Sequence, residues 1–259
     1  MGSRCRGRGP VTTSVPRSVP VKAPPADRSP VTEADAVRLA AQVPWGDALP
    51  PRAHRVSWRA ERAVKRLLDI LLSAVALALL LPVYGAIALC IALDSAGPIF
   101  YRWRVLGLHG RPFTGYKFRT MVVDADALKE QLSHLNEMNG PAFKIRNDPR
   151  VTRVGRWLRR FSLDELPQFW SVLVGDMSLV GPRPPSAGEF VRFTPEQRLK
   201  LAVTPGITCL WQVSGRANIT DFEEWARLDR SYISEWTLVL DLKVLLSTIP
   251  AVVRGSGAY

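Results

Sequence analysis

Residues 150–184 read RVTRVGRWLRRFSLDELPQFWSVLVGDMSLVGPRP, and the interpretation of the whole chain starts from this stretch. Its first part has arginines spaced three residues apart, which would form a cationic stripe on a helix, at positions 150, 153, 156 and 159. Two adjacent carboxylates, Asp164 and Glu165, follow them, and Arg183 lies between two prolines that fix the backbone around it. Guanidinium groups near carboxylates are suited to binding phosphate and a metal ion.

Spacing alone favours a structural role for Asp164 and Glu165. Neighbouring residues on a helix point about 100° apart, so the two carboxylates are not a facing acid–base pair. Ser162 and Glu165 have the spacing of a capping box, which favours helix capping over catalysis. The arginines favour the alternative, because a carboxylate beside a cationic stripe stays ionised and can act as a nucleophile or a metal ligand.

Two motifs in this stretch resemble the signature of a known family. Ser-Leu-Asp-Glu-Leu-Pro at 162–167 and Gly-Pro-Arg-Pro at 181–184 are similar to the motifs of the bacterial sugar transferases that act on polyprenyl phosphate, the monotopic phosphoglycosyl transferases. The resemblance extends from about Lys65 to Tyr259. It implies a small α/β fold embedded in the membrane, with an N-terminal re-entrant membrane helix and amphipathic helices on the membrane surface.

The resemblance also implies a reaction. A sugar 1-phosphate would pass from a nucleotide diphosphate sugar, a UDP-sugar by this resemblance, to polyprenyl (undecaprenyl) phosphate. Asp164 would form a phosphoglycosyl-aspartate intermediate with help from Glu165, and nucleoside monophosphate and polyprenyl diphosphate sugar would be the products. Mg²⁺, with Asp164 as a ligand, would neutralise phosphate charge. Such a reaction primes exopolysaccharide or glycoconjugate synthesis. The sugar, the base, the polymer and the oligomeric state, a homo-oligomer included, stay open.

Five basic residues are candidates for binding substrate phosphate. The resemblance assigns this role to Arg159 and Arg183. Lys117 and Arg119 alternate along a predicted strand and would share a face, which a solvated strand edge explains as well. Arg216, in a Ser-Gly-Arg sequence, is a weaker candidate of the same kind.

Three positions depart from the pattern of the family. Trp103 and Val105 stand where related chains usually have Gln and Arg, and Arg104 between them could compensate for a lost polar contact. Cys209 stands where a glycine is common. These departures concern a membrane-proximal strand and a turn, and they leave the predicted chemistry at Asp164 unchanged.

The apolar run from Ile70 to Leu93 has no charged residue. As a helix it would reach about 36 Å, enough to cross a hydrocarbon core. Pro82 lies at its centre and predicts a kink, because proline deletes a helical hydrogen bond. Basic residues flank both ends, so the positive-inside rule assigns no sidedness. The residues alone favour a kinked transmembrane helix; the resemblance implies a hairpin, broken at Pro82, that returns to the cytoplasmic side of a bacterial inner membrane.

The predicted organisation has three parts. Residues 1–60 are expected to be a disordered, basic, proline-rich tail, because residues 1–51 hold nine of the 21 prolines and little apolar periodicity. A short helix from Glu33 to Ala41 is the less favoured alternative there. Residues 61–97 would form the membrane helix and residues 98–259 the cytosolic catalytic domain.

Within the catalytic domain, periodicity and capping patterns predict individual elements. Strands are expected at 99–104 and 113–121, and helices at 124–138, from Thr194, from Thr220 and at 236–253. The last of these is a candidate for lying on the membrane surface.

The formal net charge of +12 and the pI near 10.2 imply an anionic partner. Two other functions are compatible with parts of the sequence. One is a membrane-anchored nucleic-acid-binding protein, although no zinc, helix-turn-helix or RNA-binding signature supports it, and no nucleic-acid partner is expected. The other is a glycosyltransferase that binds metal through Asp124 and Asp126 and releases nucleoside diphosphate. The scattered cysteines and histidines predict neither a disulfide framework nor a zinc site.

Overall fold

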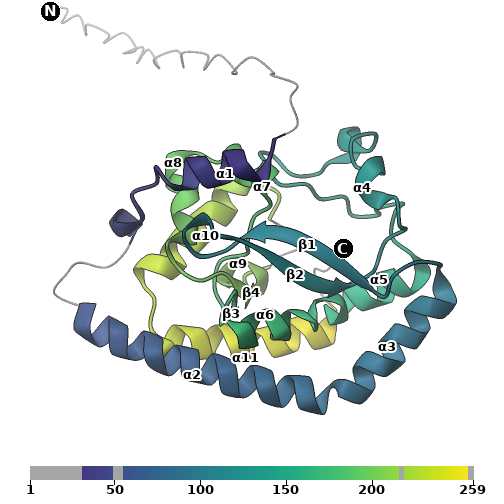
Figure 1. Cartoon of the computed structure of the whole chain (residues 1–259), viewed down its shortest axis with the longest axis horizontal. Helices are drawn as coiled ribbons and strands as arrows, with labels where there is room; N and C mark the ends of the chain where they lie inside the picture. Colours follow the sequence, from purple (N-terminus) through teal and green to yellow (C-terminus); the bar gives the residue numbers. More distant parts are fainter. Residues whose placement is uncertain (1–30, 49–54, 216–218, 256–259) are drawn as a thin grey trace, which may run out of the picture. The chain divides into compact units, whose positions relative to one another are not determined.

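The protein is described by a computed structural model over residues 31–48, 55–215 and 219–255, all within one compact unit. Its fold is mixed α/β, as predicted (Figure 1). The helices are α1 (Glu33–Ala40), α2 (Arg55–Leu79), α3 (Leu81–Asp94), α4 (Ala125–Leu128), α5 (Arg153–Arg160), α6 (Gln168–Val174), α7 (Ala187–Val191), α8 (Pro195–Arg198), α9 (Leu210–Val213), α10 (Phe222–Ser234) and α11 (Leu238–Arg254). Single 3₁₀ turns are η1 (Trp45–Ala48), η3 (Leu108–Gly110), η4 (Ser133–Leu135), η5 (Leu163–Glu165) and η6 (Leu199–Ala202).

The described strands form two separate two-stranded sheets. β1 (Phe100–Leu106) and β2 (Pro112–Phe118) are the antiparallel pair predicted from the apolar and aromatic runs, with Trp103 opposite Gly115. β3 (Ser178–Val180) and β4 (Gly206–Thr208) are parallel. The second sheet is short, and it brings the Gly-Pro-Arg-Pro motif next to the chain that follows Pro205.

The apolar run folds as two helices with a break at the predicted place. α2 ends at Leu79, and Pro82 lies in the first turn of α3, where its missing N–H costs no helical bond. The two helices are bent by 59° relative to each other. Among the described helices none is by itself both long and apolar enough to cross a membrane, whereas the bent pair meets that test of length and composition when taken together.

Basic residues hold the start of the bent pair against the rest of the fold. Lys65 donates to the carboxylate of Asp241 in α11, and Arg66 donates to backbone carbonyls at the end of α6. α11 therefore runs next to α2 (Figure 1). Asp69, one turn after Lys65 in α2, is buried, and its carboxylate accepts the backbone N–H of Leu179.

The N-terminal region departs from the tail that was predicted. Thr32 and Asp35 form a capping box at the start of α1, in which each side chain accepts the backbone N–H of the other residue. Ala36 and Ala40 of this helix pack into a core shared with α7 and α10. The expected disorder of residues 1–60 is thus wrong for residues 33–40 and for the start of α2 at Arg55. The short helix at Glu33 to Ala41, given above as the less favoured alternative, is confirmed as α1.

Two other element predictions need correction. The long helix expected at 124–138 is wrong beyond Leu128, where α4 ends. Further along, the side chain of Asn136 bonds to the backbone at residues 138, 142 and 144 and folds the chain back. The cap of α10 is Asp221 and not Thr220. The caps at Thr194 and the buried face of α10 agree with the predictions.

Candidate active site

The Asp164–Glu165 pair lies on η5, directly after α5. Ser162 precedes this turn with a left-handed backbone (φ 52°), an unusual conformation for a residue other than glycine. Its side chain makes no capping bond, so the capping box predicted from its spacing to Glu165 is wrong. The left-handed residue ends α5 and turns the next residues back, and the hydroxyl of Tyr84 in α3 donates to the carbonyl of Leu166 just beyond them.

Helix α5 is positioned from both sides at its first turn. Thr152 caps the N–H of Gly155, and Asp94 at the end of α3 accepts the N–H of Val154. Gly155 lets the helix approach β2 closely, since a Cβ there would lie 2.1 Å from the carbonyl oxygen of Thr120. The bent pair α2–α3 and the chain that follows β2 therefore both position α5, and with it η5.

The four arginines of the predicted stripe lie in different surroundings. Arg150 precedes α5, and Arg153 and Arg156 lie on its exposed side. Arg159 is half-buried, and its Nε donates to the hydroxyl of Thr120 at 2.9 Å. Of these four arginines, Arg150 and Arg159 line the cavity that contains the carboxylate pair.

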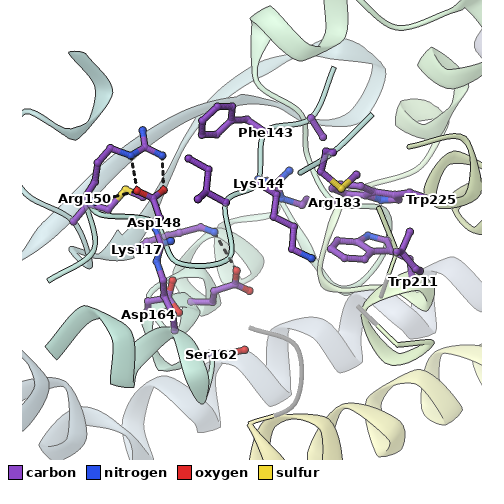
Figure 2. Close-up of a pocket in the computed structure, with 17 residues that line it drawn as sticks. Lys117, Phe143, Lys144, Asp148, Arg150, Ser162, Asp164, Arg183, Trp211 and Trp225 are labelled. Carbon is purple, nitrogen blue, oxygen red and sulfur yellow. Dashed lines mark hydrogen bonds and ion pairs between the residues drawn. The ribbon is translucent and has the colours of Figure 1, made fainter. Parts of the chain in front are cut away.

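Asp164 and Glu165 face a cavity with a strongly charged side and an aromatic side (Figure 2). The predicted residues Lys117, Arg159 and Arg183 line the same cavity. In the view of Figure 2, Lys144 and Arg183 lie between Asp164 and two tryptophans, Trp211 and Trp225. The structure thus brings together residues from β2, α5, η5, the loop after β3, α9 and α10.

Glu165 and Lys117 form an ion pair at 3.1 Å, and each side chain is less than one-fifth exposed. The ammonium of Lys117 also lies 4.4 Å from the centre of the Trp103 ring. Register explains this contact: Trp103 is opposite Gly115, and Lys117 is the diagonal neighbour two residues further on the same face. Trp103 therefore helps to position a cation of the site.

Arg183 is held in a loop that is fixed at both ends. Gly181 and Gly206 approach so closely that a Cβ on Gly206 would lie 2.1 Å from the nitrogen of Gly181. The guanidinium lies 5.5 Å from the Trp103 ring and 5.7 Å from the Trp225 ring. It also pairs with Glu189. Burial raises the pKa of this Glu189 carboxyl, but Arg183 and the capping bonds of Ser186 outweigh it and lower the pKa overall.

Asp148 and Arg150 form a second ion pair on the cavity wall. The guanidinium donates to both carboxylate oxygens, at 2.9 and 2.6 Å, and both side chains are buried. Burial raises the pKa of Asp148, and the bonds from Arg150 outweigh that effect, so its pKa lies below 3.8. We did not predict Asp148, Lys144, Trp211 or Trp225 as site residues. For Asp148 and Lys144, the many charged residues at 144–150 were the sequence signal that could have indicated a site.

Two predicted phosphate ligands, Arg119 and Arg216, are not among the described residues that line the cavity shown in Figure 2. Arg119 lies on the predicted strand but is buried, and its guanidinium donates to the backbone carbonyls of Ser95, Ala96 and Pro98. It joins the chain after α3 to the end of β2, and its expected role at substrate phosphate stays a prediction. Arg216 lies outside the described residues.

The described part of the chain has no cluster of three or more His, Cys, Asp or Glu side chains able to hold a metal ion by themselves. Mg²⁺ commonly uses only one or two carboxylates and completes its shell with substrate phosphates and water. Asp164 lies beside two carboxylates that already pair with cations, Asp148 and Glu165, and this arrangement fits such a site. Asp126 accepts a hydrogen bond from the Tyr101 hydroxyl, and exposed Asp124 caps nothing.

The model of the family described as "Bacterial sugar transferase" matches residues 60–255. The chain belongs to this family. The matched region contains every cavity residue described above, and it leaves α1 and η1 outside.

Three relatives are similar over most of the chain. A "Galactosyl transferase CpsE" of Streptococcus agalactiae is 48% identical over 63% of this chain and 36% of its own length. An "Undecaprenyl-phosphate galactose phosphotransferase" of Salmonella typhimurium is 42% identical over 78% and 43%. A "UDP-glucose:undecaprenyl-phosphate glucose-1-phosphate transferase" of Caulobacter vibrioides is 41% identical over 75% and 72%. The chain thus spans less than half of the first two relatives.

Proposed function

We propose that this protein transfers a sugar 1-phosphate from a UDP-sugar to undecaprenyl phosphate or a similar polyprenyl phosphate. The observation that carries the proposal is the position of Asp164, in a cavity shared with Lys117, Arg159 and Arg183. Three cations around one carboxylate suit a reaction in which phosphate groups meet a negatively charged nucleophile. The names of the relatives support the same donor and acceptor classes.

The reaction has two steps. In the first, a carboxylate oxygen of Asp164 attacks the β-phosphorus of the donor, the bond to the bridging oxygen breaks, and its electrons leave with uridine monophosphate. In the second, a phosphate oxygen of the acceptor attacks the same phosphorus, and the bond to Asp164 breaks, which restores the carboxylate. A covalent intermediate lets one anionic substrate leave before the other arrives.

The cations have separate tasks in this proposal. Arg183 and Arg159 bind the diphosphate and stabilise the charge that develops on the leaving phosphate. Lys117 holds Glu165 in place through the 3.1 Å ion pair. Mg²⁺, with Asp164 as a ligand, would supply further neutralisation of phosphate charge.

The identity of the released nucleotide tests the reaction class. Protein in detergent is incubated with polyprenyl phosphate, Mg²⁺ and UDP-galactose or UDP-glucose, the two sugars named among the relatives. We expect the monophosphate, no turnover by Asp164→Asn, and near-normal turnover by the matched control Asp124→Asn. Release of the diphosphate, together with loss of activity in Asp124→Asn, would instead support the metal-dependent glycosyltransferase.

We also propose that the bent pair α2–α3 forms a hairpin in one leaflet of a bacterial cytoplasmic membrane, with the catalytic domain on the cytoplasmic side. Exposed apolar residues on α11 recur at helical spacing and support a helix that lies on the same surface, at Val239, Leu242, Leu246, Ile249 and Val253.

The test places single cysteines at Ala60 and Ala96, on either side of the bent pair, in a cysteine-free background. A hairpin predicts that a membrane-impermeant thiol reagent reaches both from the cytoplasmic side only. Labelling of the two positions from opposite sides would contradict the hairpin and indicate a kinked spanning helix.

A further inference from the structure

A second cavity meets the first at the carboxylate of Asp164. It is lined by residues 100–103 of β1 and by residues 117–123 at the end of β2 and beyond it. The two cavities share Met121 and four charged residues, which are Lys117, Arg159, Asp164 and Arg183. These four residues therefore form a charged junction that can be reached from two directions.

The second cavity has an apolar wall that leads away from this junction. Its wall includes aromatic and branched side chains that are unusually exposed, with Phe100 at 44%, Tyr101 at 40% and Val123 at 67%. The Tyr101 hydroxyl donates to Asp126, and burial together with that carboxylate raises its pKa to about 12. Exposed apolar surface rimmed by charge is typical of a binding site.

The apolar wall is continuous with the bent helix pair. Phe100 stacks on Phe118 with ring centres 5.3 Å apart, and Phe118 contacts the ring of Tyr84 in α3 at 5.4 Å. Ile87 and Ile91 of α3 lie in the same apolar cluster as Phe118. Apolar side chains thus connect the helix proposed to enter the membrane with the charged junction at Asp164.

We propose that this second cavity, along Phe100, Tyr101 and Val123, binds the acceptor lipid, with its phosphate at the charged junction and its first apolar units on the wall. The inference rests on the proposed function and adds the location of one substrate. The anionic head of such a lipid matches the cations of the charged junction, and its apolar chain matches the apolar wall that leads away from them. The donor then occupies the first cavity, on the side of Lys144, Trp211 and Trp225.

A third cavity could take a lipid chain instead, between α6, α9 and α11. It is lined by apolar residues such as Phe169, Ala251 and Val252, and it reaches Glu165. Arg160 is its only cation among the described residues, and it does not include Asp164. A phosphate bound there would lack the three cations of the junction, so we assign the acceptor to the second cavity.

The arrangement predicts that the two half-reactions can be separated by mutation. Exchange of labelled uridine monophosphate into the UDP-sugar requires only the first step, whereas lipid product requires both. Val123→Asp places a charge on the apolar wall at an exposed position, so the fold should tolerate it. It should leave exchange within about twofold of wild type and lower kcat/KM for a short polyprenyl phosphate by about tenfold or more, because a carboxylate faces the apolar chain and the lipid phosphate.

Three variants complete the experiment. Val123→Leu keeps the wall apolar and should behave as wild type. Val37→Asp introduces the same charge on exposed α1 and controls for a general effect. Ala251→Asp tests the third cavity and should leave kcat/KM for the lipid unchanged.

The outcomes are distinguishable. Exchange by wild type with normal lipid transfer by Val123→Asp would overturn this inference, and selective loss in Ala251→Asp would move the acceptor to the third cavity. Lipid transfer by wild type without any exchange would contradict the covalent route of the proposed function instead.

Discussion

Trp103 offers a sensitive test of how the cations of the site are held. Replacing it by leucine keeps an apolar side chain on β1 and removes the π face on which Lys117 and Arg183 lie, at 4.4 and 5.5 Å. The side chains of these cations are 18% and 34% exposed. A cation–π contact contributes about 0.5–1 kcal/mol when exposed and about 2 kcal/mol when desolvated, so each contact here is estimated at about 1 kcal/mol.

The loss expected for Trp103→Leu is therefore about 2 kcal/mol if both contacts stabilise the transition state. This corresponds to a decrease of roughly 30-fold in kcat/KM for the UDP-sugar. The assay follows initial rates of uridine monophosphate release against UDP-sugar concentration, with the thermal unfolding midpoint measured alongside. Trp103→Phe retains a weaker π face and should fall between wild type and leucine.

Two controls separate this effect from general damage. Trp157→Leu removes a 54% exposed indole outside the cavities and should change kcat/KM by less than about twofold. A double-mutant cycle with Lys117→Met should give a coupling energy of about 1 kcal/mol. A Trp103→Leu enzyme as active as wild type, or one with no coupling to Lys117, would refute the reasoning.

Two further predictions concern the walls of the site. Gly155→Ala places a Cβ 2.1 Å from the carbonyl oxygen of Thr120, so α5 must shift; we expect a loss of about 1–3 kcal/mol in stability, measured by denaturant unfolding, and a fall in turnover. Asp148→Asn leaves the buried Arg150 without its ion pair and should cost about 3 kcal/mol near neutral pH. Because the pKa of Asp148 is lowered from 3.8, its contribution is fully present above pH 3.8 and is lost as the pH falls through the lower folded value. The stability difference between wild type and Asp148→Asn should therefore shrink below pH 3.8, and a difference that persists to lower pH would contradict the assigned ion pair.

Local patterns predicted much of the fold because their causes are local. The break at Pro82, the β1–β2 pair and the buried face of α10 each follow from residues within one segment. The packing of α1 depends on a core shared with distant segments, so composition made its helix the less favoured alternative. The turn at Asn136 depends on bonds between its side chain and the backbone, which helical periodicity does not reveal.

The site was predicted where motif and chemistry agreed. Lys117, Arg159, Arg183 and the carboxylate pair meet in one cavity. Arg119 directly follows β2, the strand of Lys117, and its guanidinium donates to backbone carbonyls of the chain after α3, which alternation along a predicted strand cannot reveal. Asp148 reaches the cavity from a loop without a recognisable motif, so only the tertiary structure identifies it.

The covalent role of Asp164 is the central claim, and trapping the intermediate tests it most directly. Purified protein is incubated with Mg²⁺ and UDP-sugar in the absence of lipid acceptor, quenched in acid, and examined by intact-mass and peptide mass spectrometry. The account predicts a mass increase equal to one sugar phosphate, located on the peptide that contains Asp164, and one equivalent of uridine monophosphate. It also predicts that added polyprenyl phosphate discharges the adduct into lipid product. An active enzyme that forms no adduct, or an adduct that persists in Asp164→Asn, would contradict it.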